Sequence, residues 1–148
     1  MKKISPHQAT WIRRLARVMP LYNHLGLRLS KLGWARSEMR IKIGKELTQD
    51  TGVAHGGVLA SLVDSVVGLA LYTMLTPNDL ITTIELKINF IMPAKPGVLT
   101  GVGKIFHKGK RIAVGDAEVR DEEGMLIAKG LVTCMVLSHS GQRVLNLS

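Results

Sequence analysis

One carboxylate interrupts an otherwise apolar stretch of the sequence. The segment Gly52–Leu75, GVAHGGVLASLVDSVVGLALYTML, contains Asp64 as its one charged residue. The apolar residues predict a buried helix, in which a charge without partners is costly. Asp64 lies too far inside to cap this helix, so it is a candidate for an ionisable group in an apolar cleft. The alternative is that Asp64 bonds Ser61 or faces solvent through a gap.

The start of the predicted helix carries a second set of chemically useful groups. His55, Gly56 and Gly57 stand where the helix should begin. Free amides at a helix N-terminus, with the helix dipole behind them, favour developing negative charge, and glycine lets another molecule approach the backbone. A tight loop-to-helix turn would explain the same residues without any chemistry. No second histidine falls at ligand spacing, so we expect no metal site.

The spacing of these two groups has a geometric consequence. Gly56 and Asp64 are eight residues apart, which is about 12 Å along a helix. They cannot both touch one reacting carbonyl from a single chain. If both serve one reaction, two chains must meet with their helices side by side and antiparallel, which predicts a homodimer with two shared sites.

Composition limits the class of protein. The chain has 148 residues, 46% hydrophobic and 21% charged, which are values typical of one globular domain. Basic residues occur along the whole chain, so the net charge of +9 favours a solvated basic surface over a dedicated anionic partner. The single cysteine, Cys134, fits a reducing compartment, and the N-terminus does not resemble a secretory signal. We therefore expect a cytoplasmic protein.

Hydrophobic periodicity predicts the elements that position the candidate groups. Residues 7–19 form a basic amphipathic helix that ends at Pro20. Strands are predicted over 25–29, 35–43, 82–90, 98–107, 111–120 and 125–137, with the long helix after the second of them. Strict alternation in 82–90 places Thr83 on the solvent face with Glu85 and Lys87. The central Asp64 disfavours a membrane span for the long helix.

These elements predict an α+β fold. Short turns between the last strands imply an antiparallel sheet, and a helix that is apolar nearly all round must be covered on more than one side. We expect a curved antiparallel sheet wrapped around one long central helix, plus a short N-terminal helix. A single domain would span residues 1–148, with a helical extension at 1–21 and a short polar tail at 138–148.

Three segments resemble the hotdog-fold acyl-CoA thioesterases of the phenylacetate-pathway (PaaI-like) type. They are GVAHGGVLASLVDSVVGLA, TTIELKINFIMPAKPG and HKGKRIAVGDAEVRDEEGMLIAKG, and the resemblance extends from Tyr22 to Leu137. Its most specific features are the His-Gly-Gly motif, an acid nine residues after the histidine and a strand that ends in Met-Pro-Ala. The resemblance implies a hotdog fold and an enzyme that hydrolyses acyl-CoA to free acid and CoA. It implies no metal and no cofactor, because coenzyme A is part of the substrate.

The resemblance also implies roles for individual residues. Asp64 matches the catalytic carboxylate, acting as general base or as nucleophile, and the Gly56 N–H matches the oxyanion donor. His55 supports the loop, Gln49 falls beside the substrate carbonyl, and Thr83 aligns with a residue that positions water. The substrate-binding residues implied are Gly57, Ser61, Lys108, Lys110 and Arg111, of which the last three would receive the phosphates of CoA.

The expected partners are the acyl-CoA substrate and further copies of the chain, as a homodimer or a dimer of dimers, with no nucleic acid and no membrane. One alternative is a hotdog hydratase or dehydratase acting on acyl-CoA or acyl carrier protein. Such enzymes use a catalytic histidine paired with an acid, and the sequence lacks a compact motif of that kind. A second alternative is a non-catalytic acyl-CoA sensor, or a nucleic-acid binder that uses the positive charge, although no nucleic-acid-binding motif is visible.

Overall fold

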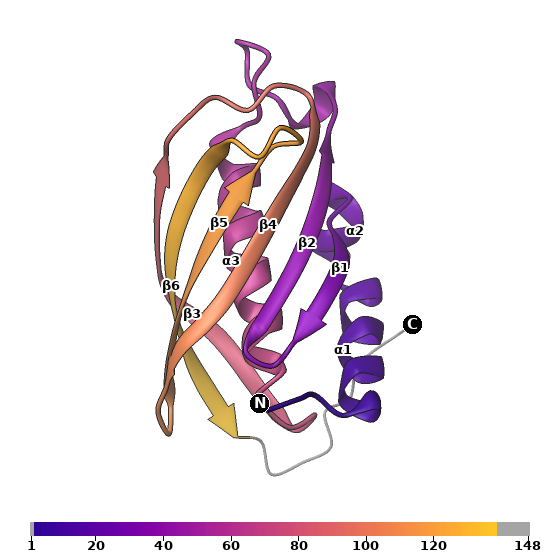
Figure 1. Cartoon of the computed structure of the whole chain (residues 1–148), viewed down its shortest axis with the longest axis vertical. Coiled ribbons are helices and arrows are strands. Elements are labelled where there is room, and N and C mark those ends of the chain that lie inside the picture. The colour runs from indigo at the N-terminus through magenta and orange to yellow at the C-terminus, as the bar shows by residue number, and fades with distance from the viewer. Residues whose placement is uncertain (1, 139–148) are drawn as a thin grey trace.

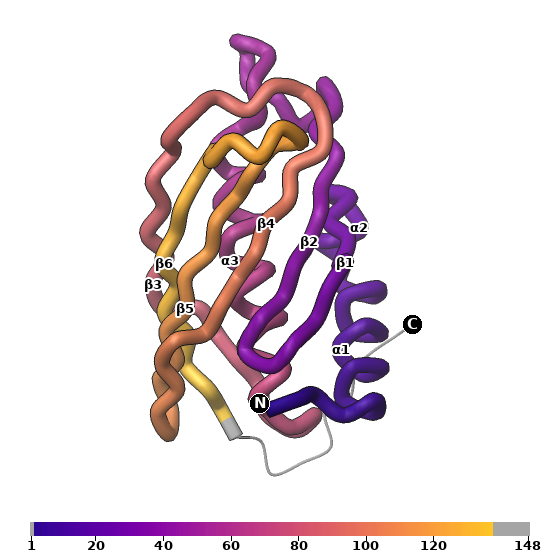
Figure 2. Tube along the Cα trace, viewed as in Figure 1, coloured from indigo at the N-terminus to yellow at the C-terminus, as the bar shows by residue number. Residues whose placement is uncertain are grey.

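A six-stranded sheet wraps around one long helix in the computed structural model, which describes residues 2–138 (Figure 1). The elements in chain order are α1 (Pro6–Val18), α2 (Pro20–Leu25), β1 (Arg28–Gly33), β2 (Arg36–Ile43), the 3-10 helix η1 (Lys45–Leu47), α3 (Gly56–Tyr72), β3 (Asp79–Phe90), β4 (Gly97–Lys108), β5 (Ile112–Arg120) and β6 (Leu126–Ser138). All strand pairs are antiparallel, in the order β1-β2-β4-β5-β6-β3. The trace in Figure 2 follows the curvature of this sheet around α3. The predicted hotdog architecture is confirmed.

The described part of the chain ends with strand β6. Apart from Ser138, which ends β6, the tail predicted over residues 138–148 lies outside the described residues. Within residues 2–138, no helix combines the length and apolar character needed to cross a bilayer. The long apolar segment is instead the core helix α3, as the sequence predicted.

The N-terminal segment contains one helix more than the sequence predicted. α1 is the expected amphipathic helix, capped by Ser5, which accepts a hydrogen bond from Gln8 N. Pro20 ends α1 but also begins α2, because proline is well accommodated in the first turn of a helix. Gly26, with φ 76°, then terminates α2 in the left-handed region. The strand expected over residues 25–29 was therefore wrong at its start, and β1 begins at Arg28.

Helix α3 lies unusually close to the sheet. An added Cβ at Gly103 of β4 would stand 2.6 Å from the carbonyl carbon of Val66, and one at Gly130 of β6 would stand 2.5 Å from a methyl group of Val63. Val63 and Val66 are completely buried. Since side chains at these sheet positions would collide with the helix, the glycines fix how near α3 approaches the strands.

A β-bulge in β3 corrects the predicted alternation. The β3–β6 register shifts between Thr83 and Glu85, so Ile84 is an extra residue. Thr83 pairs with the buried Cys134 and faces α3, whereas Glu85 pairs with Thr133 on the opposite face. The prediction that Thr83 shares the solvent face with Glu85 was wrong, because the extra residue in the bulge places Thr83 and Glu85 on opposite faces of the sheet.

We expect Gly103→Ala to lower the free energy of unfolding by about 1–3 kcal/mol, because its methyl group must displace helix backbone. Urea unfolding followed by circular dichroism measures this. Gly33→Ala is the matched control, since a Cβ there meets nothing within 4 Å. Equal stabilities of the two variants would contradict the close-approach role of Gly103.

Candidate active site

The segment before α3 is held by backbone bonds that place His55 at the helix start. His55 N donates to Leu47 O at 2.9 Å, and Ala54 N donates to Ala94 O at 2.8 Å. His55 is the N-cap, and its Nδ1 accepts from Gly57 N at 2.9 Å. In the neutral imidazole the proton must then lie on Nε2. The exposed His55 is therefore the cap of the helix mouth.

The amide of Gly56 is the free donor at this mouth. Gly56 N–H has no acceptor within residues 2–138, because His55 caps the following amide instead. The ring of Phe90 lies over Gly56, where an added methyl group would come within 3.1 Å of the ring. An unpaired helix N-terminal amide beside an apolar wall is a suitable donor to an anionic oxygen.

A pocket of about 510 Å³ opens at this mouth. It brings together three predicted residues, Gln49, His55 and Gly56, and its walls are mainly apolar. The Gln49 amide donates one hydrogen bond to Thr51 Oγ1, at 3.0 Å. The full lining is Gln49, Val53, Ala54, His55, Gly56, Leu59, Phe90, Ile91, Met92, Pro93 and Ala94. Such a pocket suits an uncharged, largely apolar group that carries one carbonyl.

Asp64 is hydrogen-bonded to Thr83, a residue predicted from the sequence to lie on the solvent face of its strand. Thr83 Oγ1 donates to Asp64 Oδ1 at 2.7 Å, whereas Ser61 Oγ donates to Gly57 O, one turn back. The alternative that Asp64 is hydrogen-bonded to Ser61 is therefore wrong. Asp64 is half-buried, and no described residue donates to its Oδ2. One carboxylate oxygen is thus fixed and the other is available.

The Asp64–Thr83 pair has two further neighbours. Cys134 Sγ lies 3.9 Å from Thr83 Oγ1, and burial raises the pKa of the Cys134 thiol, so this thiol stays neutral. The pKa of Tyr22 is raised to about 12, chiefly by burial, while a hydrogen bond with Ser65 lowers it and the nearby charge of Asp64 raises it. Neither neighbour is an activated nucleophile.

The start of α3 and the Asp64 carboxylate lie along the same side of the molecule. Gly57, Ser61, Asp64 and Gly68 recur at helical spacing and form a strip that the sheet leaves partly uncovered. Strand β3 runs beside this strip, with Thr83 at the carboxylate and Phe90 at the mouth. β3 is an edge strand, and among residues 2–138 no further strand continues the sheet on this side.

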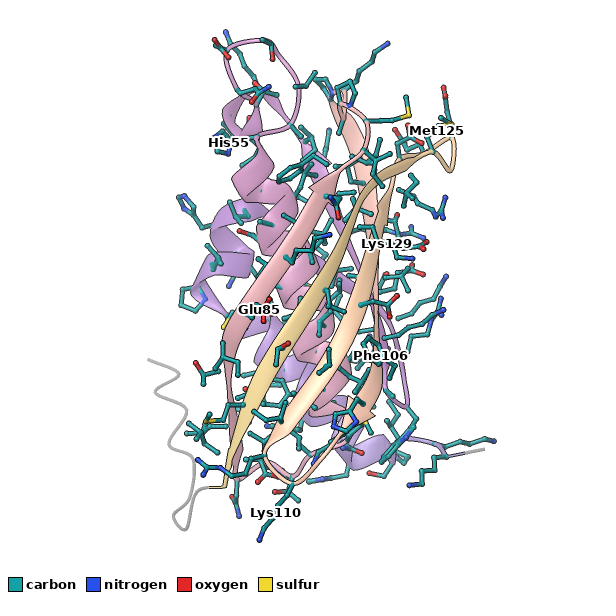
Figure 3. All side chains as sticks on the ribbon, turned by 90° about the vertical axis from the view of Figure 1, so that its left-hand side faces the viewer. His55, Glu85, Phe106, Lys110, Met125 and Lys129 are labelled. Carbon is teal, nitrogen blue, oxygen red and sulfur yellow. The ribbon has the colours of Figure 1, made fainter. Side chains whose placement is uncertain are left out.

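The basic turn predicted to bind phosphates lies elsewhere. Lys108, Lys110 and Arg111 occupy the β4–β5 hairpin, and Figure 3 places Lys110 at the opposite end of the molecule from His55. Lys108 Nζ donates to the backbone oxygen of Gly109, and Arg111 Nη2 contacts Met135 Sδ at 3.8 Å. Within one chain, the structure does not bring this turn to the helix mouth.

Two residues of the site were not anticipated. Phe90 forms a wall of the mouth, and the Met-Pro-Ala motif directly after its strand was the available signal. Nothing in the sequence pattern marked Tyr22, because its place beside α3 depends on the unpredicted helix α2. Within residues 2–138, no group of three histidine, cysteine, aspartate or glutamate side chains could hold a metal ion.

The structure is that of a hotdog protein with an unpaired amide at the start of its central helix, and sequence comparison specifies the family. Residues 51–128 match the family model of the Thioesterase superfamily. A protein of Saccharolobus solfataricus is 34% identical over 125 residues, which cover 84% of this chain and 83% of the relative. The chain belongs to the thioesterase superfamily and is a thioester hydrolase.

Two further relatives have named activities. The 1,4-dihydroxy-2-naphthoyl-CoA hydrolase of Escherichia coli is 27% identical over 113 residues, covering 76% of this chain and 83% of the relative. The medium/long-chain acyl-CoA thioesterase YigI of Salmonella typhimurium is 26% identical over 133 residues, covering 80% of this chain and 86% of the relative.

Solved structures agree on the fold. A thioesterase family protein from Silicibacter pomeroyi superimposes with a TM-score of 0.84 at 26% identity, covering 88% of this chain and 98% of the other. The E. coli PaaI protein of the phenylacetic acid degradation operon gives a TM-score of 0.81 at 20% identity, covering 90% and 96%. The latter is similar in fold alone, and that fold is the PaaI-like one that the resemblance implied.

Replacement of His55 tests its role as the N-cap of α3. We expect His55→Ala to lower the free energy of unfolding by about 1 kcal/mol, because Gly57 N–H loses its acceptor. His55→Asn should retain most of the stability, since asparagine is a good N-cap. Thermal unfolding of both variants measures this, and an equal loss in both would argue against the cap.

Proposed function

We propose that the protein hydrolyses acyl-CoA thioesters to the free acid and CoA, at a site that two copies of the chain share. The observation that carries this proposal is the hydrogen bond from Thr83 to Asp64, on the open side of α3. It supports a carboxylate held for chemistry, in a superfamily of thioester hydrolases. The acyl-CoA substrate is inferred from relatives named as an acyl-CoA hydrolase and an acyl-CoA thioesterase.

The proposed chemistry divides between the two groups of α3. The Gly56 N–H receives the oxygen of the thioester carbonyl as it becomes negative. Asp64 Oδ1 is held by Thr83, so Oδ2 is free for one of two routes. It takes a proton from a water molecule that attacks the carbonyl carbon, or it attacks that carbon itself to form an anhydride, which water then hydrolyses to the free acid. The carbon–sulfur bond breaks and CoA leaves as a thiolate, which needs no strong acid. The reaction uses no metal and no cofactor, so EDTA should leave turnover unchanged.

A second copy of the chain supplies the missing geometry. Gly56 and Asp64 of one chain are eight residues apart on α3, about 12 Å, which is too far for one carbonyl. Two chains that pair through their β3 edges, with antiparallel helices, would bring the Gly56 amide of one to Asp64 of the other. The exposed side chains of Ile84 and Leu86 on β3 favour this edge as the contact.

The same pairing accounts for the basic turn. Figure 3 shows His55 and Lys110 at opposite ends of one chain, so in an antiparallel pair the β4–β5 hairpin of one copy would lie at the same end as the helix mouth of the other. Lys108, Lys110 and Arg111 could then receive the phosphates of a CoA whose thioester lies at the partner's mouth. The acyl group would lie against the apolar walls formed by Leu59 and Phe90.

We expect Asp64→Asn to reduce kcat for acyl-CoA by about 10²–10⁴-fold, because the amide can neither take a proton nor attack. Release of free thiol from a panel of aliphatic and aryl-CoA thioesters measures it. Thr83→Val should lower kcat by about tenfold, since a lost hydrogen bond to a charged group is worth at least that much, while Thr83→Ser should stay close to wild type. Full activity of a folded Asp64→Asn protein would refute the assignment.

Disruption of the β3 edge should abolish both assembly and activity. Ile84 is 52% exposed, and Ile84→Lys would place a charge in the proposed contact. Sedimentation at micromolar concentration should give a dimer or dimer of dimers for wild type and a folded, inactive monomer for the variant. The control is Phe106→Lys, at a 63% exposed residue of β4 away from this edge, which should keep the dimer and its turnover. A fully active monomer would exclude the shared site.

A further inference from the structure

The positive charge of the chain is concentrated near its N-terminus once acidic residues are considered. The first acidic residue in the sequence is Glu38, and residues 1–37 hold eight of the 20 lysines and arginines. Residues 38–148 are therefore almost neutral, and +8 of the net charge of +9 lies in residues 1–37, which contain α1, α2 and β1. The proposed hydrolysis uses none of these residues.

Three of these cations surround one pocket. The pocket, of about 320 Å³, lies between α1, α2 and β1 and is lined by Arg13, Ala16, Arg17, Asn23, Leu27, Arg28 and Leu29. We call it the arginine pocket. Arg13 and Arg17 stand one turn apart on α1, while Arg28 is the first residue of β1. It shares no lining residue with the pocket at the mouth of α3.

The guanidinium groups of this pocket lack carboxylate partners. The ion pairs within residues 2–138 involve Lys31, Arg40, Arg120 and Lys129, and none involves an arginine of the pocket. Arg28 Nη1 donates to the backbone oxygen of Leu27 at 3.0 Å, which holds that side chain while its remaining donors stay available. Asn23 is held in the same way, by a hydrogen bond from its Nδ2 to Arg17 O at 2.8 Å.

We propose that the arginine pocket binds a small molecule that carries a diphosphate group. Several guanidinium groups around one hollow match the bidentate geometry and the double charge of adjacent phosphates. The apolar floor formed by Ala16, Leu27 and Leu29 suits the ring of a nucleotide. The pocket is at the small end of the range for ligand sites, about 300–1,000 Å³, so it fits one nucleotide rather than a polymer.

A lipid surface is the less suitable occupant. Insertion of an amphipathic helix into a membrane requires a free apolar face. The apolar face of α1 is already used, because Ile12 and Leu15 are buried in the core of the domain. What α1 leaves to solvent is mainly its basic side, with Arg13, Arg14 and Arg17, and the single exposed Val18 at its end is too small an apolar surface for insertion.

Calorimetric titration of the full chain with pyrophosphate and with ADP tests the proposal. We expect both to bind, with affinity that falls as salt is raised. Arg13→Ala combined with Arg17→Ala should weaken ADP binding by about a hundredfold, since each charged hydrogen bond contributes about tenfold. Arg17→Lys should also weaken ADP binding, because lysine keeps the positive charge but cannot donate two parallel hydrogen bonds to a phosphate.

Arg14→Ala is the matched control, since Arg14 has the same charge on the same helix but does not line the pocket. It should change ADP affinity by less than about twofold. An equal loss of ADP affinity in Arg14→Ala and in the Arg13→Ala, Arg17→Ala double variant would overturn the pocket in favour of a diffuse basic surface. Absence of pyrophosphate and ADP binding, or binding to anionic phosphatidylserine vesicles alone, would overturn it as well.

Two sources of the diphosphate can be distinguished. If unacylated CoA displaces ADP, the pocket takes the nucleotide end of a CoA molecule other than the one whose thioester lies at the helix mouth; if it does not, the ligand is a free nucleotide, and either result supports the proposal. Asp64→Asn should bind ADP as the wild type does, because Asp64 does not line this pocket. A failure of the arginine pocket therefore leaves the proposed hydrolysis untouched, and the reverse also holds.

Discussion

The close contact between α3 and the sheet is the constraint on which the other features depend. Glycines at Gly101, Gly103, Gly115 and Gly130 occupy the inner faces of β4, β5 and β6, where any side chain would collide with the helix or a strand. The helix therefore cannot shift or rotate without losing buried contacts on several strands at once. Its remaining strip, with Asp64, is fixed in direction as firmly as the core itself.

The bulge in β3 supplies the hydrogen-bond partner of Asp64, whose position is fixed by the helix. Had β3 alternated strictly through residue 84, Thr83 would share a face with Glu85, and Asp64 would have no partner on that strand. One extra residue lets Thr83 face the helix while Glu85 and Lys87 still face away. A sheet can thus supply a polar group to an inner site without adding polar residues to the rest of its buried face.

How far the sequence could predict this protein follows from which interactions are local. Helix α1, the start of α3 at Gly56 and strand β2 depend on periodicity and capping, and they were predicted correctly. Helix α2 was not, because the same Pro20 that ends one helix can begin another. The face of the sheet on which Thr83 lies was predicted wrongly, because a bulge depends on the partner strand β6 and leaves no sign in the alternation of β3 itself.

The two edges of the sheet differ in a way that limits how copies of the chain can assemble. The β1 edge packs against α1, as Figure 1 shows, whereas the β3 edge is open and carries the exposed Ile84 and Leu86. A chain with two open edges could extend into a fibre, but a chain with one can pair only through a two-fold axis, which closes the assembly. The same asymmetry separates the proposed sites. The open edge borders the groups for thioester chemistry, and the covered edge borders the arginine pocket, so a ligand in that pocket need not compete with the second copy of the chain.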